Sequence, residues 1–130
     1  MIGWWRRRRF ADVIARQLAL FAADHAATIE RARGALANYD AAVDEADGVD
    51  AYGAFEDLCE DLEDALTGMR DSWASNLEPP LDARYRSAFD HAALRAWRDV
   101  LPGLTHRPFE PRRTSDGPDD DLPPLEPRER

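Results

Sequence analysis

The sequence predicts an all-α fold: an antiparallel up-down-up three-helix bundle with one long first helix and a disordered C-terminal tail. Apolar residues recur every three or four positions from residue 10 to residue 101, as they do on one face of an α-helix. Two turn signals, at 47–50 and 79–80, divide this pattern into three segments. Short connections make consecutive helices antiparallel neighbours, which gives the bundle.

The first predicted helix spans residues 10–46. No proline interrupts it, and Gly34 is its weakest position. At 1.5 Å per residue it would be on the order of 55 Å long. Residues 47–50 then predict a turn, with Asp50 as the N-cap of the next helix. The stripe consists of Phe10, Ile14, Leu18, Phe21, His25, Ile29, Ala32, Leu36, Tyr39, Val43 and Ala46.

The second and third predicted helices span residues 50–77 and 80–101. Pro79 and Pro80 end the second helix and suit the first turn of the third, where a missing N–H costs nothing. The stripe of the second helix consists of Tyr52, Phe55, Cys59, Leu62, Leu66, Met69, Trp73 and Leu77. From residue 102 the periodicity is lost and prolines and aspartates recur, so residues 102–130 are predicted to be a disordered tail. Leu104 and Phe109 are candidates for local docking.

Composition narrows the classes of partner and compartment. The chain has 26 acidic and 17 basic residues and a formal net charge of −9, which argues against nucleic acid as a partner. The single cysteine, Cys59, forms no intrachain disulfide and suits a reducing compartment, which favours a cytoplasmic protein with membrane association as an alternative. We expect no membrane-spanning helix, because the chain has no apolar run near 18 residues.

Residues 1–9 are predicted to form a basic, aromatic arm separate from the first helix. The arm contains two tryptophans and four arginines: Trp4, Trp5, Arg6, Arg7, Arg8 and Arg9. If the helix were extended back from Phe10, Arg7 would fall on the apolar stripe and both tryptophans would leave it. Arginines at a helix N-terminus also oppose the helix dipole.

Helix register predicts an uncovered apolar stripe at the start of the first helix. The second helix ends near Leu77, which lies opposite Leu20, so the earlier part of the first helix extends beyond it. The residues left uncovered are Phe10, Val13, Ile14 and Leu18. Uncovered apolar patches mark interaction sites, so the arm and this stripe are the predicted binding surface. Its occupant would be a protein partner, a second copy of this chain or an anionic membrane surface.

Residues 56–64 hold six acids, for which three interpretations remain open. Register places Arg31 and Arg33 near Asp64, and Arg95 and Arg98 near Glu60 and Glu63, which favours a belt of ion pairs worth little in stability. The alternatives are an acidic face for a basic partner and a metal site. Metal sites in helical bundles use a Glu-x-x-His spacing, and the chain contains none.

Motifs of catalytic chemistry are missing from the sequence: it has no phosphate-binding loop, nucleophile elbow or zinc-binding His-Glu motif. His25 is expected to be buried and bonded to a hydroxyl, and Cys59 to be a small core residue. The sequence therefore predicts a non-enzymatic adaptor or accessory protein without a cofactor, which binds through the arm and the start of the first helix. The alternatives are a peripheral membrane protein using the same surface and a metal-binding bundle using the acids of the second helix.

Overall fold

The computed structural model describes residues 2–111, with side chains from residue 10 onward, and this part of the chain is helical without strands. The elements are α1 (Ile2–Asp24), α2 (Ala26–Ala41), α3 (Glu45–Ala74), α4 (Leu81–Trp97), the 3-10 turn η1 (Arg98–Val100) and α5 (Pro102–His106). The predicted all-α class is confirmed. The up-down-up three-helix arrangement is not confirmed, because the described residues form four long helices.

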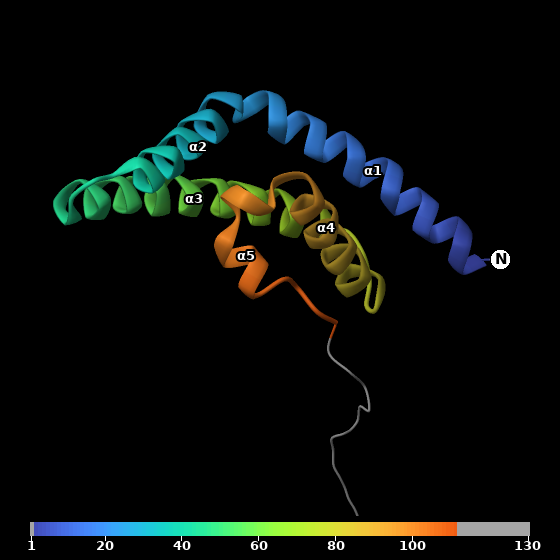
Figure 1. Cartoon of the computed structure of the whole chain (residues 1–130). Helices are drawn as coiled ribbons and strands as arrows, with labels where there is room; N and C mark the ends of the chain where they lie inside the picture. The colour runs from blue at the N-terminus through green and yellow to red at the C-terminus, as the bar shows by residue number, and fades with distance from the viewer. Residues whose placement is uncertain (1, 112–130) are drawn as a thin grey trace, which may run out of the picture.

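The first predicted helix is divided in two at His25. The φ and ψ of this residue, −116° and 18°, lie outside the helical region. Backbone hydrogen bonds nevertheless continue across it, from His25 N to Phe21 O and from Ile29 N to His25 O, both at 2.9 Å. The chain therefore bends without unwinding, and α1 and α2 run in different directions (Figure 1). This bend lets α2 pack along α3 while α1 packs along α4.

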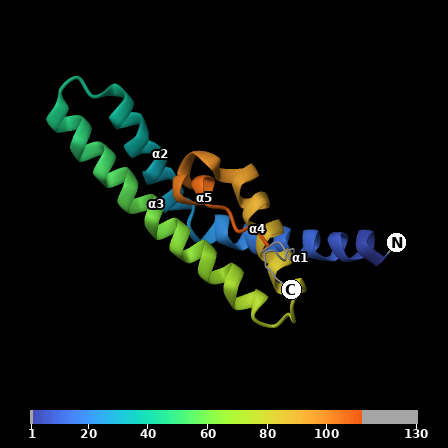
Figure 2. The ribbon, with the colours of Figure 1, turned by 90° about the horizontal axis from the view of Figure 1, so that it is seen from below.

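The helices α2 and α3 form a hairpin (Figure 2). Its turn lies between Ala41 and Glu45, earlier in the sequence than predicted. The side chain of Asp44 accepts a hydrogen bond from Asp47 N at 2.8 Å, so Asp44 is the N-cap of α3 and the prediction of Asp50 is wrong. Glu45 and Asp47 stand in the first turn, where negative charge favours a helix. Gly48 accordingly lies inside α3 and not in the turn.

The predicted disorder from residue 102 onward is wrong for residues 102–111. The third predicted helix ends at Trp97, and the chain turns through η1 into α5, which packs against α3. Leu104 is only 6% exposed, and Phe109 N donates to the carboxylate of Asp90 at 2.6 Å. These contacts offset the entropy cost of ordering the segment. The rest of the predicted tail, 112–130, lies outside the described residues.

The hydrophobic core lies between α1, α2, α3 and α4 and is closed by η1 and α5. In α3, the predicted stripe residues Phe55, Cys59, Leu62 and Leu66 are all buried, as their spacing required. The largest apolar side chains that are fully buried are Phe21, Leu62, Leu66, Tyr85, Phe89, Val100 and Leu101. The start of α1 extends beyond this core at one end of the molecule, and the α2–α3 turn extends beyond it at the other (Figures 1 and 2).

Candidate interaction groove

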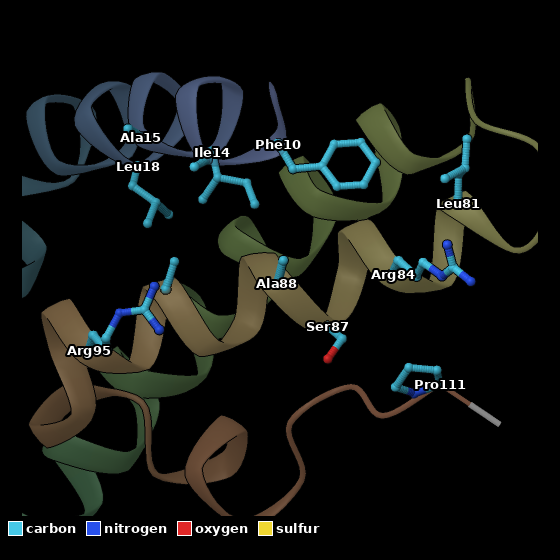
Figure 3. A pocket seen from close by; sticks show the side chains of 12 residues that line it. Phe10, Ile14, Ala15, Leu18, Leu81, Arg84, Ser87, Ala88, Arg95 and Pro111 are labelled. Carbon is cyan, nitrogen blue, oxygen red and sulfur yellow. The ribbon is translucent and has the colours of Figure 1, made fainter. Parts of the chain in front are cut away.

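An open groove with a volume of about 700 Å³ lies between α1 and α4 (Figure 3). One wall comes from α1, with Phe10, Ala11, Ile14, Ala15 and Leu18. The other comes from α4, with Leu81, Arg84, Ser87, Ala88, Ala92 and Arg95, and Pro111 also lines the space. A volume of this size is typical of sites that take a ligand or several side chains of a partner.

Small side chains create the groove. Ala11 and Ala15 stand four residues apart on α1, and Ala88 and Ala92 do the same on α4. Residues four apart share one helix face, so each wall carries a pair of alanines where larger side chains would fill the space. Figure 3 shows the short side chains of Ala15 and Ala88 on facing helices. The groove therefore follows from the sequence of both helices.

Contacts along the groove hold α1 onto α4. Ile14 is only 4% exposed, and the rings of Phe10 and Tyr85 meet edge to face with their centroids 5.7 Å apart. The hydroxyl of Tyr85 donates a hydrogen bond to the side-chain oxygen of Gln17. Burial raises the pKa of Tyr85 to about 12, an effect that the bond to Gln17 partly opposes. The hydroxyl therefore stays protonated at neutral pH and keeps its role as donor.

The four apolar residues predicted to be uncovered are largely covered. Ile14 is buried, while Phe10, Val13 and Leu18 are half-buried. The prediction of a bare stripe is wrong because it assumed a straight first helix, whereas the bend at His25 brings α1 against α4. Three of the four residues line the groove, and Val13 packs toward the core beside it. Partner binding at these residues stays a prediction.

The backbone of residues 2–9 is helical, so the prediction of a separate N-terminal arm is wrong. Helix α1 begins at Ile2, so residues 2–9 continue the helix and do not form a separate arm. Extending a helix that is already nucleated costs little, and arginine has a high helix propensity, which together outweigh the unfavourable dipole interaction. The side chains of Trp4, Trp5 and Arg6 to Arg9 lie outside the described residues.

Two arginines of α4, Arg84 and Arg95, place positive charge at the groove. Arg84 and Arg95 are exposed, and among residues 10–111 neither forms an ion pair. Figure 3 shows their guanidinium groups at separate points along α4. Arg86 on the same helix is different, because it pairs with Asp71 at 2.9 Å and with Asp82 at 3.3 Å. The groove thus combines apolar walls with two exposed cations.

Sequence reasoning missed a buried polar cluster beside the groove. Asp90 is fully buried and accepts hydrogen bonds from Arg70 Nη1 at 3.0 and 2.9 Å and from Phe109 N at 2.6 Å. Two guanidinium groups lie over the ring of Phe109, with the central carbon of Arg70 5.6 Å and that of Arg86 5.8 Å from the ring centroid. The one signal in the sequence was an isolated aromatic residue in a proline-rich segment. This cluster holds the segment around Phe109 in place, and the same segment brings Pro111 to the groove.

The predicted belt of ion pairs around residues 56–64 is wrong. Arg33 pairs with Asp99 at 2.8 Å instead of Asp64, and Arg95 lines the groove. Glu63 accepts a hydrogen bond from Gly103 N at 2.7 Å. The expected pairs require three straight antiparallel helices. The turn through η1 and α5 instead places Asp99 beside Arg33 and Gly103 beside Glu63.

Cys59 and His25 were expected from the sequence to be core residues, and the structure shows the surroundings of each. Cys59 is buried, and burial raises the pKa of its thiol to about 12, with Glu63 adding to the effect. The thiol therefore stays protonated at neutral pH, as suits the predicted core residue. His25 was expected to be buried against a hydroxyl, but it is half-buried and its ring lies against that of Phe21, with centroids 4.6 Å apart.

Other kinds of site find no support in the described part of the chain. Within residues 2–111, no helix has the length and apolar character needed to cross a membrane. The same residues contain no group of three or more His, Cys, Asp or Glu side chains arranged to hold a metal ion. Neither a known protein family, nor a curated protein, nor a solved structure matches the chain.

Proposed function

We propose that this protein is a non-catalytic adaptor or accessory protein whose α1–α4 groove binds an amphipathic helix of a protein partner. The observation that carries the proposal is the combination of apolar walls from two helices with two exposed arginines, Arg84 and Arg95. Recognition of a helix in a groove uses apolar anchors at helical spacing, with charges beside them setting specificity.

The dimensions of the groove support a helical occupant. Its lining on α4 extends from Leu81 to Arg95, which is roughly 20 Å at the rise of an α-helix. About four turns of a partner helix span that length, enough for three or four anchor residues. The alanine pairs on each wall would let the backbone of the partner approach closely, and Phe10 and Leu18 would contact its apolar side chains.

The charges support a partner with acids beside its apolar stripe. Arg84 and Arg95 stand eleven residues apart on α4, about three turns, and both lie at the groove. Acidic residues at matching positions of a partner helix would pair with them at the rim, where charge governs association rate and choice of partner more than affinity. Four more arginines, Arg6 to Arg9, precede the groove in the same helix as its first wall.

Two labelled peptides of designed sequence test the proposal by fluorescence anisotropy with the full chain. Both carry the same leucine stripe at helical spacing, flanked by glutamate in one and by lysine in the other. We expect the glutamate peptide to bind at least about tenfold more tightly, a difference of about 1.4 kcal/mol.

A matched pair of variants locates the binding. Ala15 and Ala19 are both exposed on α1, and of the two only Ala15 lines the groove. Ala15→Arg fills the groove and should abolish binding of the glutamate peptide, whereas Ala19→Arg should leave it unchanged. Absence of saturable binding, or an equal loss in both variants, would contradict the proposed function.

A further inference from the structure

The tip of the α2–α3 hairpin carries large apolar side chains in solvent. Val43 in the turn is 95% exposed, Val49 in α3 is 64% exposed, and Tyr39 and Tyr52 are 44% and 41% exposed. The two tyrosine rings lie against each other with centroids 5.1 Å apart. Single exposed apolar residues are ordinary, but four of them gathered at one projecting end indicate a contact surface.

This tip is acidic. Five carboxylates surround the apolar residues, namely Asp40, Asp44, Glu45, Asp47 and Asp50, and all are exposed. The sequence contains no arginine or lysine between Arg33 and Arg70, so the tip of the hairpin has no basic residue of its own. An uncompensated acidic surface around an apolar centre fits a partner that is both basic and apolar.

The opposite end of the molecule has the complementary composition. The first turns of α1 contain Trp4, Trp5 and Arg6 to Arg9, and the first acid in the chain is Asp12. Figures 1 and 2 both show the N-terminal end of α1 and the α2–α3 turn at opposite ends of the molecule. One copy therefore cannot satisfy its own acidic tip with its own basic end.

We propose that the acidic tip of the α2–α3 hairpin binds the tryptophan- and arginine-containing start of α1 in a second copy of this chain. The two surfaces are different and complementary, so the contact is head to tail and repeats from copy to copy. An end-to-end contact is small, so the association is weak and sensitive to salt. The contact does not use the groove, although it does use Arg6 to Arg9, which precede the groove in α1.

Two charge-reversed full-length chains test this contact. The first, the acidic-start variant, replaces Arg6 to Arg9 with glutamate. The second, the basic-tip variant, carries Asp40→Lys, Glu45→Lys and Asp50→Lys, which spares the cap residue Asp44. All the replaced tip residues are exposed, and far-UV circular dichroism verifies that both variants keep the helical fold. Sedimentation velocity then measures the average mass of each chain alone and of their mixture.

The unmodified chain should gain mass with concentration at about 20 mM salt and return to a monomer at about 500 mM salt. Each variant alone should stay monomeric, because its two ends carry like charge. Mixing the variants should restore association, because each end then meets an opposite charge on the other chain. Ala15→Arg in the groove should leave the association unchanged.

Three results would overturn the proposal. The unmodified chain could remain monomeric at low salt and high concentration. The mixture could sediment as the sum of its separate components. The unmodified chain could instead stay monomeric and bind vesicles of anionic lipid through Arg6 to Arg9, which would assign this end to a membrane surface.

Discussion

The buried carboxylate of Asp90 accepts two hydrogen bonds from a single nitrogen of Arg70, at 3.0 and 2.9 Å. The pair joins α3 to α4, and Phe109 N donates a third hydrogen bond to the same carboxylate. A buried charge is tolerated only when its hydrogen-bonding capacity is satisfied. This one acid therefore joins α3, α4 and the backbone of Phe109.

Removal of the Asp90 carboxylate should be strongly destabilising. Asp90→Ala leaves the guanidinium of Arg70 with only Asp71 as an acidic partner among the described residues, and breaking a buried pair costs on the order of 3 kcal/mol. Arg33→Gln is the matched control, because the Arg33–Asp99 pair is about half exposed and should cost less than about 1 kcal/mol. Urea unfolding compares the two, and equal losses would refute the assigned importance of Asp90.

The Asp71 carboxyl should make stability depend on acid pH. Burial opposes its ionisation, but hydrogen bonds from Arg70 and Arg86 outweigh this and hold its pKa below the ordinary 3.8. The unfolded chain binds this proton more tightly, so the stability that the carboxylate adds is present above pH 3.8 and is lost as pH falls through the lower pKa of the folded state.

Asp71→Asn removes this contribution. Its free energy of unfolding should therefore fall less steeply than that of the unmodified chain when both are measured from about pH 5 to about pH 2. Asp99, whose pKa is lowered by the hydrogen bond from Arg33, remains in both proteins and accounts for part of the slope they share. Parallel curves would show that Asp71 contributes nothing.

Apolar spacing was sufficient to predict the fold class and the buried face of α3, where Phe55, Cys59, Leu62 and Leu66 all lie in the core. It was insufficient at His25, because Phe21 and Ile29 lie four residues on either side and keep the helical period through the bend. Sequence reasoning treats such a stripe as one straight helix. The packing of α1 on α4, and therefore the groove between them, could not be predicted from the apolar spacing.

The sequence also misled the prediction of the N-cap of α3 and of the structure of residues 102–111. Asp44 and Asp50 are both acceptable helix caps, and Gly48 favoured the later one, although the structure uses Asp44. Residues 102–111 have the composition of a disordered segment, and they are ordered by Leu104 in the core and by the distant acid Asp90. Composition alone does not reveal a partner that lies far away in the sequence.

The thiol of Cys59 should be inert in the folded protein. It is only 2% exposed, and burial raises its pKa to about 12, so thiolate is scarce at neutral pH. An aromatic disulfide reagent at about pH 8 should therefore leave it unmodified in buffer and modify it completely in denaturant. Rapid reaction without denaturant would show that the core around α3 opens easily.

Two glycine substitutions should have opposite effects on stability. Nothing lies within 4 Å of a Cβ built at Gly53 in α3, so Gly53→Ala should stabilise the protein by about 0.5–1 kcal/mol through helix propensity. A Cβ at Gly103 would lie 2.7 Å from Glu63 Oε1. Gly103→Ala should therefore displace Glu63 from its hydrogen bond and lower stability by about 1 kcal/mol. Thermal unfolding ranks the two variants, and a stabilised Gly103→Ala would contradict the described contact.

The most direct test of the proposed function is the location of the bound glutamate peptide on the isotopically labelled full chain, read from amide chemical shifts. The groove account predicts that the largest changes occur at its two alanine pairs, Ala11 and Ala15 on α1 and Ala88 and Ala92 on α4. Changes confined to the α2–α3 tip, or spread evenly over the surface, would contradict it.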